Sequence, residues 1–73
     1  MINEIVINHS EKYGVIVTIK GEDEADQLDD YLSENFYIHY DLREDDGKTE
    51  FLFGQGASLE VVKNILSSFQ LSN

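Results

Sequence analysis

Carboxylates are the side chains of this sequence that could do chemistry, and they are concentrated between residues 22 and 34. That segment contains seven acidic residues and no basic residue. Asp23, Asp26, Asp30 and Glu34 recur at spacings that bring side chains onto one side of a helix, with neighbouring Cβ atoms about 5–6 Å apart. Like charges at these spacings destabilise a helix, which favours a role for them outside folding. We call these four residues the acidic stripe.

The acidic stripe has two interpretations. It could present a row of negative charge that resembles a phosphate backbone and fits a basic groove on another protein, with Asp45 and Asp46 extending the row if the hairpin tip that carries them folds alongside. The alternative is a solvated acidic face that keeps a small protein soluble. No sequence motif decides between them.

Metal binding and catalysis are poorly supported by the residue types and their spacing. The acids of residues 41–47 do not fit a calcium loop, because the required glycine register puts apolar residues at the first and last ligand positions. His9 and His39 are the only histidines and, without cysteine, form no zinc signature. The serines lack a nucleophile-elbow context, and Gly54 and Gly56 lack the third glycine and the lysine of phosphate-binding loops. We therefore expect no enzyme, no metal and no cofactor.

The composition limits the classes of partner. With 5 basic and 15 acidic residues the net charge is -10, so the protein repels nucleic acid and anionic membranes but attracts basic protein surfaces. Many basic surfaces in cells are the nucleic-acid-binding grooves of other proteins. A content of 41% hydrophobic residues is enough for a folded core. The first residues lack the basic and long apolar regions of a signal peptide, so we expect a cytoplasmic protein with no membrane contact.

Hydrophobic periodicity predicts the elements that position these side chains. Residues 2–8 and 13–20 are rich in β-branched residues and form a hairpin, and residues 22–35 have the apolar spacing of an amphipathic helix. Residues 36–43 alternate as a half-buried strand, and residues 44–47 form a bulged turn that leads to a return strand at 48–53. Ser58 is placed to cap a last helix.

The predicted order is ββαββα, which favours an α+β fold in one acidic domain that spans residues 1–73. Its simplest packing is a four-stranded antiparallel sheet with both helices on one face. A shift of 34 residues places Val17 on Phe51 and Leu28 on Val62. These matches indicate a pseudo-twofold ββα repeat, or reflect only the spacing that any two ββα units share.

The face of this sheet opposite the helices would remain open. Alternation places there an apolar and aromatic centre made of Val6, Ile16, Tyr37, His39 and Leu52. Open apolar surfaces commonly mark interfaces, and a chain of this size buries only about 60% of its unfolded surface, so association would stabilise it. We expect a homodimer through this face. Burial of His39 there would make association sensitive to pH near neutrality.

In size, charge and absence of catalytic motifs, the chain is similar to small phage and mobile-element inhibitors, including anti-restriction and anti-CRISPR proteins that imitate DNA. That similarity covers composition, and no family motif is matched residue by residue. It implies a protein-binding inhibitor that blocks a basic nucleic-acid-binding site. The alternative is a self-associating structural, assembly or immunity-type module whose acidity serves solubility.

Overall fold

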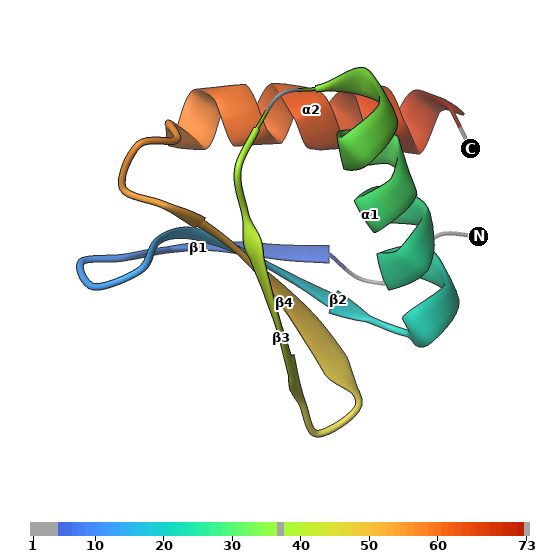
Figure 1. Cartoon of the computed structure of the whole chain (residues 1–73), viewed down its shortest axis with the longest axis horizontal. Coiled ribbons are helices and arrows are strands. Elements are labelled where there is room, and N and C mark those ends of the chain that lie inside the picture. Colours follow the sequence, from blue (N-terminus) through green and yellow to red (C-terminus); the bar gives the residue numbers. More distant parts are fainter. Residues whose placement is uncertain (1–4, 37, 73) are drawn as a thin grey trace.

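The chain alternates two β-hairpins with two helices, in the order ββαββα that the sequence predicts (Figure 1). The computed structural model describes residues 5–36 and 38–72. Its elements are β1 (Ile5–Ser10), β2 (Gly14–Lys20), α1 (Glu22–Asn35), β3 (Asp41–Asp45), β4 (Lys48–Gly54) and α2 (Leu59–Ser72). The first strand extends two residues beyond the predicted end at residue 8, because Asn8, His9 and Ser10 pair with β2.

The four strands form one antiparallel sheet in the order β1-β2-β4-β3. β2 and β4 lie at its centre, where Val17 pairs directly with Phe51. These two residues are 34 positions apart in the sequence, which is the shift that overlays the two halves. A pseudo-twofold axis that relates the halves would therefore pass between them. The two halves are not identical, however, because three residues connect β1 to β2 and two connect β3 to β4.

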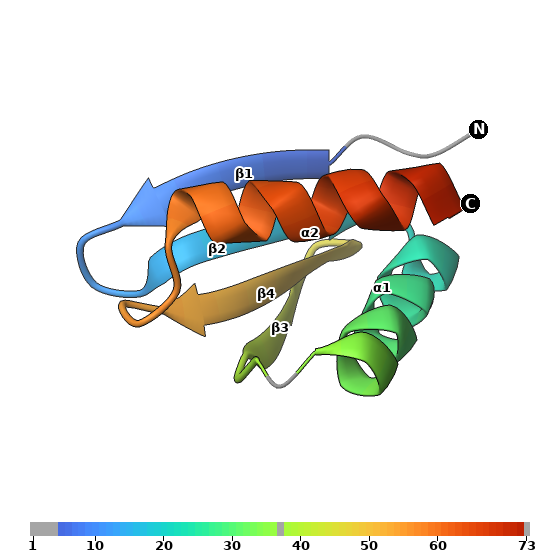
Figure 2. The same cartoon turned by 90° about the horizontal axis from the view of Figure 1, so that it is seen from above.

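Both helices lie on one face of the sheet, as predicted (Figure 2). Inward residues of β2 and β4 and one stripe of each helix form the core, because strand and helix periodicity bring apolar side chains to these positions. Val15, Val17, Ile19, Phe51, Leu28 and Leu32 are at most 1% exposed. α2 runs along β1 and β2, whereas α1 contacts β2 and β4 and tilts away from β3 (Figures 1 and 2).

Local signals fix where the helices begin. Gly21 precedes α1 with a φ of 114°, a conformation that favours glycine, and acidic residues in the first turn suit the helix dipole. The backbone N–H of Val61 donates to the Ser58 hydroxyl at 3.1 Å, which confirms the predicted N-cap of α2.

The second hairpin has a tighter turn than the bulged loop that the sequence predicted. β3 ends at Asp45 and β4 begins at Lys48, so only Asp46 and Gly47 connect them. Their φ angles are 51° and 78°, and two positive values belong to a type I′ turn. The aspartate–glycine pair is a preferred sequence for this turn, whose twist matches that of the flanking strands.

The third strand is shorter than predicted. β3 covers Asp41–Asp45, whereas the alternation predicted a strand over residues 36–43. Phe36, Ile38 and Tyr40 pack against the core, so the alternation in burial is real, but residues 38–40 belong to no strand. Residues 38–40 lead into β3, and their burial alternates as predicted although they lie outside the ladder.

Candidate functional site

The acidic stripe lies on α1 as the sequence predicts. α1 is helical from Glu22 to Asn35, and Asp23, Asp26, Asp30 and Glu34 are exposed, whereas Ala25, Leu28 and Leu32 of the same helix are buried. Within the part of the chain that the structure describes, no carboxylate of α1 forms a salt bridge. The helix therefore presents its charge to solvent.

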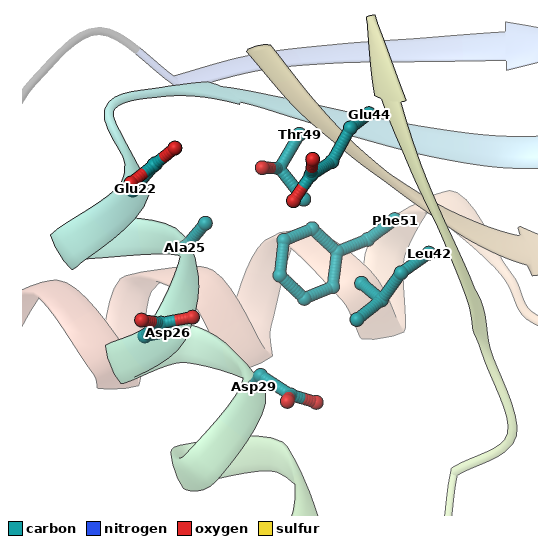
Figure 3. A pocket seen from close by; sticks show the side chains of 8 residues that line it. All are labelled: Glu22, Ala25, Asp26, Asp29, Leu42, Glu44, Thr49 and Phe51. Atoms are coloured by element: carbon teal, nitrogen blue, oxygen red, sulfur yellow. The ribbon is translucent and has the colours of Figure 1, made fainter. Parts of the chain in front are cut away.

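A groove of about 500 Å³ opens between α1 and β3 (Figure 3). Its lining is in part apolar, with Leu42 and Phe51 from the sheet and Ala25 from the helix. Four carboxylates also line it, from Glu22, Asp26, Asp29 and Glu44. We call this feature the acidic groove. Only Asp26 belongs to both the groove and the acidic stripe, so the carboxylates of α1 form a broader surface than one row.

The tip of the second hairpin lies beside the first turn of α1. Asp45 and Asp46 line a neighbouring hollow together with Glu22 and Glu44. The predicted proximity of the hairpin tip to the acidic helix is therefore present at one end of α1. Lys48 lines the same hollow, and strand alternation directs Asp45 to the opposite face of the sheet, so this end of the surface carries charges of both signs and does not lengthen the stripe.

Tyr40 connects the middle of α1 to the chain segment that precedes β3. Its hydroxyl donates to the Asp29 carboxylate, with the Asp29 carbonyl oxygen 3.1 Å away. The ring packs against Phe51 and Phe53 at centroid distances of 5.6 and 5.8 Å. Burial, together with the hydrogen bond to Asp29, raises the pKa of Tyr40 above its ordinary value. Tyr40 thus links α1 to the core beside the acidic groove.

The sheet face away from the helices carries a different mixture of side chains. Val6 is 40% exposed, and Ile16 and Leu52, which pair across β2 and β4, are half-buried. Strand alternation places Lys20, Arg43 and Lys48 on this face with Asp41, Asp45 and Glu50. The Arg43 guanidinium pairs with Glu50 at 2.6 Å and lies 5.6 Å from the Tyr13 ring centre. We call this surface the open sheet face.

Two residues predicted on the open sheet face do not support it. His39 precedes β3, so the predicted position within a strand is wrong, and its exposed side chain lines a hollow with Phe53 and Ile65. Residues 38–40 belong to no strand, so no ladder places His39 on the open sheet face. Tyr37 lies outside the described residues. Val6, Ile16 and Leu52 occupy the predicted face.

The acidic groove was not predicted from the sequence. Leu42 pairs with Phe51 and faces the helix side of the sheet, yet no helix covers it. Leu42 is 49% exposed because α1 tilts away from β3. Helix tilt depends on the packing of many side chains, and no local pattern in the sequence encodes it.

Within the described residues, no group of three or more histidine, aspartate or glutamate side chains is arranged to hold a metal ion. Neither helix of the described chain combines the length and the apolar character that crossing a bilayer requires. No family model, curated protein or solved structure matches the chain. What its surfaces can bind follows from their geometry and charge.

Proposed function

We propose that this protein is an inhibitor that imitates nucleic acid and blocks the basic, nucleic-acid-binding surface of another protein. The observation that carries the proposal is the segregation of charge on α1 and the acidic groove. α1 and Glu44 together supply eight carboxylates, and no basic residue lies on α1 or lines the acidic groove. Enzymes of nucleic-acid metabolism and defence are the target class, which places the action of the protein in the cytoplasm.

The density of charge on α1 is close to that of a nucleic-acid strand. A helix of 14 residues is about 21 Å long, so its seven carboxylates give one negative charge per roughly 3 Å. A single strand of DNA carries one phosphate charge per about 3.4 Å of helix axis. A cationic groove built for a phosphate backbone would therefore meet a similar linear charge on α1.

The same charge would steer association. Uncompensated carboxylates on one side raise the encounter rate with a basic surface and make binding fall as salt increases. The energetic cost of the arrangement is like-charge repulsion between successive residues of the stripe. A binding role explains why the helix tolerates that repulsion.

Two variants with equal net charge test the proposal. The stripe variant carries Asp23→Asn, Asp30→Asn and Glu34→Gln. The control carries Glu11→Gln, Asp41→Asn and Glu60→Gln, which removes the same number of charges from exposed positions outside α1. Each is used as bait in a cell lysate beside the wild type, and duplex DNA is added to displace the captured proteins.

We expect wild type and control to retain the same nucleic-acid-binding proteins, and duplex DNA to release them. The stripe variant should bind each captured protein at least about tenfold more weakly, because several charge contacts are lost together. If stripe variant and control bind equally, total charge rather than its position is responsible, and the proposal is wrong.

A second candidate function is self-association through the open sheet face. It is favoured by the half-buried Ile16 and Leu52 beside exposed Val6, surrounded by charges of both signs. Val6→Glu with Leu52→Glu should convert a dimer to a monomer in light scattering. Leu59→Glu with Val61→Glu, which changes exposed apolar residues of α2 by the same charge, should leave the dimer intact. A wild type that is monomeric at high micromolar concentration excludes this candidate.

A further inference from the structure

The acidic groove has an apolar wall on the helix side of the sheet, and no helix covers this wall. Leu42 and Phe51 pair across β3 and β4, yet Leu42 is 49% exposed and Phe51 is fully buried. α1 turns away from β3, and the groove of about 500 Å³ takes the space that a closer helix would fill (Figure 3). An inward-facing leucine with this exposure is available for an apolar contact with a ligand.

The charges around this wall limit what can occupy the groove. Glu22, Asp26 and Glu44 are exposed carboxylates on its two sides, and no basic residue lines it. An apolar ligand would remove these carboxylates from water without replacing their hydrogen bonds, and an anion would be repelled. The groove therefore favours an occupant that combines an apolar stem with a cationic end.

An arginine side chain has both properties. Its methylene groups can pack along Leu42 while the guanidinium remains at the polar rim. Five N–H donors in a planar fork can reach carboxylates on both walls, and such charge-assisted bonds are stronger than neutral ones. Asp29 is already bonded to Tyr40, which leaves Glu22, Asp26 and Glu44 as the acceptors.

We propose that the acidic groove binds an arginine side chain from an exposed basic segment of the partner protein. The inference rests on the proposed function and adds a specific anchor to it. The acidic stripe supplies long-range attraction, whereas the groove selects a side chain by shape. Leu42 and the facing carboxylates of Glu22, Asp26 and Glu44 are the residues that determine this specificity.

The test uses the full chain labelled with ¹⁵N and a hexa-arginine peptide at near-physiological salt. We expect the largest backbone shift changes at the groove, including Ala25, Leu42 and Thr49. Leu42→Arg places the chain's own cation in the groove and should weaken peptide binding about tenfold. Val61→Arg makes the same charge change at a residue with a similar exposure of 50%, and should stay within about twofold of wild type.

A second variant separates shape from charge. Leu42→Ser keeps the net charge but removes the apolar side chain, and we expect about fourfold weaker binding, since one buried methylene contact contributes about 0.8 kcal/mol. Because Leu42 is half exposed, both variants should keep the wild-type fold, which their spectra will show directly.

The outcomes distinguish the groove from the stripe. If the stripe variant loses affinity and both Leu42 variants bind as tightly as wild type, the groove inference is overturned and the proposed function stands. If all variants bind equally, both are wrong. Shift changes confined to the open sheet face, or peptide-independent dimerisation that covers the groove, would also overturn the inference.

Discussion

The helix side and the open sheet face of this protein carry charge in different ways. The helix side gathers eight carboxylates from α1 and Glu44 without a basic residue among them. The open sheet face places Lys20, Arg43 and Lys48 among three acids. Solubility depends on total charge and would be served equally by an even distribution. The uneven distribution is therefore the observation that supports the proposed binding of a cationic partner by α1.

The two surfaces also differ in the interactions that maintain their structure. The open sheet face is built on β2 and β4, whose backbones are paired along their length. The acidic groove depends on the tilt of α1, to which the Tyr40–Asp29 hydrogen bond contributes beside the buried residues of the helix. One surface should therefore be as stable as the whole domain, whereas the other can be loosened by losing a single hydroxyl.

The largest loss of stability is expected from a change in the central strands, which support both surfaces. A Cβ at Gly14 would lie 2.1 Å from the carbonyl oxygen of Gly54, and Gly14 has a φ of 75°. Gly14→Ala should reduce the free energy of unfolding by about 3 kcal/mol or more, through backbone strain and overpacking. Urea denaturation measures this loss. Gly56→Ala meets no atom within 4 Å, and an equal loss there would contradict the explanation.

Tyr40→Phe should loosen α1 and its acidic groove but leave the open sheet face unchanged. Loss of the hydroxyl removes the hydrogen bond to Asp29 and should cost about 1 kcal/mol. Hydrogen exchange should increase in α1 and remain unchanged in β1 and β2. Equal increases throughout the chain would mean that Tyr40 supports the whole core rather than the orientation of α1.

The pH dependence of stability provides a second measurement at Tyr40. Its pKa is raised above the ordinary value of 10.0, so the neutral hydroxyl is favoured in the folded state. This contribution is fully present below pH 10 and is lost as pH rises toward the folded pKa. Wild type should therefore lose stability in that alkaline range more steeply than Tyr40→Phe. Parallel curves for the two proteins would contradict the assigned cause.

The sequence predicted most of the fold because the elements depend on local patterns. Apolar periodicity located α1 with both ends correct, and the hydroxyl of Ser58 caps α2 as expected. The acidic stripe followed from the same helical period. The site as a whole did not, because Leu42, Glu44 and Asp29 meet only through the tilt of α1, a property of tertiary packing. The strand predicted over residues 36–43 was too long because the burial alternation of residues 38–40 continues outside the ladder.

A smaller effect is expected on the open sheet face. Arg43 and Glu50 form an exposed ion pair, and Arg43→Gln should reduce stability only slightly. The difference from wild type should shrink as salt is raised, because exposed pairs are screened. Urea denaturation at low and high salt measures it. A loss that persists at high salt would indicate packing of the Arg43 stem on Tyr13 instead of charge.

The smallest expected effect is a gain in stability, and it distinguishes a role of the acidic stripe in binding from a role in folding. Asp26 and Asp30 are four residues apart on α1, so Asp26→Asn with Asp30→Asn should stabilise the fold by about 0.2–0.5 kcal/mol by relieving like-charge repulsion. The gain should disappear at high salt, and Glu11→Gln with Glu60→Gln should show no comparable gain. A variant that unfolds later, stays soluble and binds its partner more weakly would show that these carboxylates serve binding. Destabilisation would instead reveal that the acids support the fold.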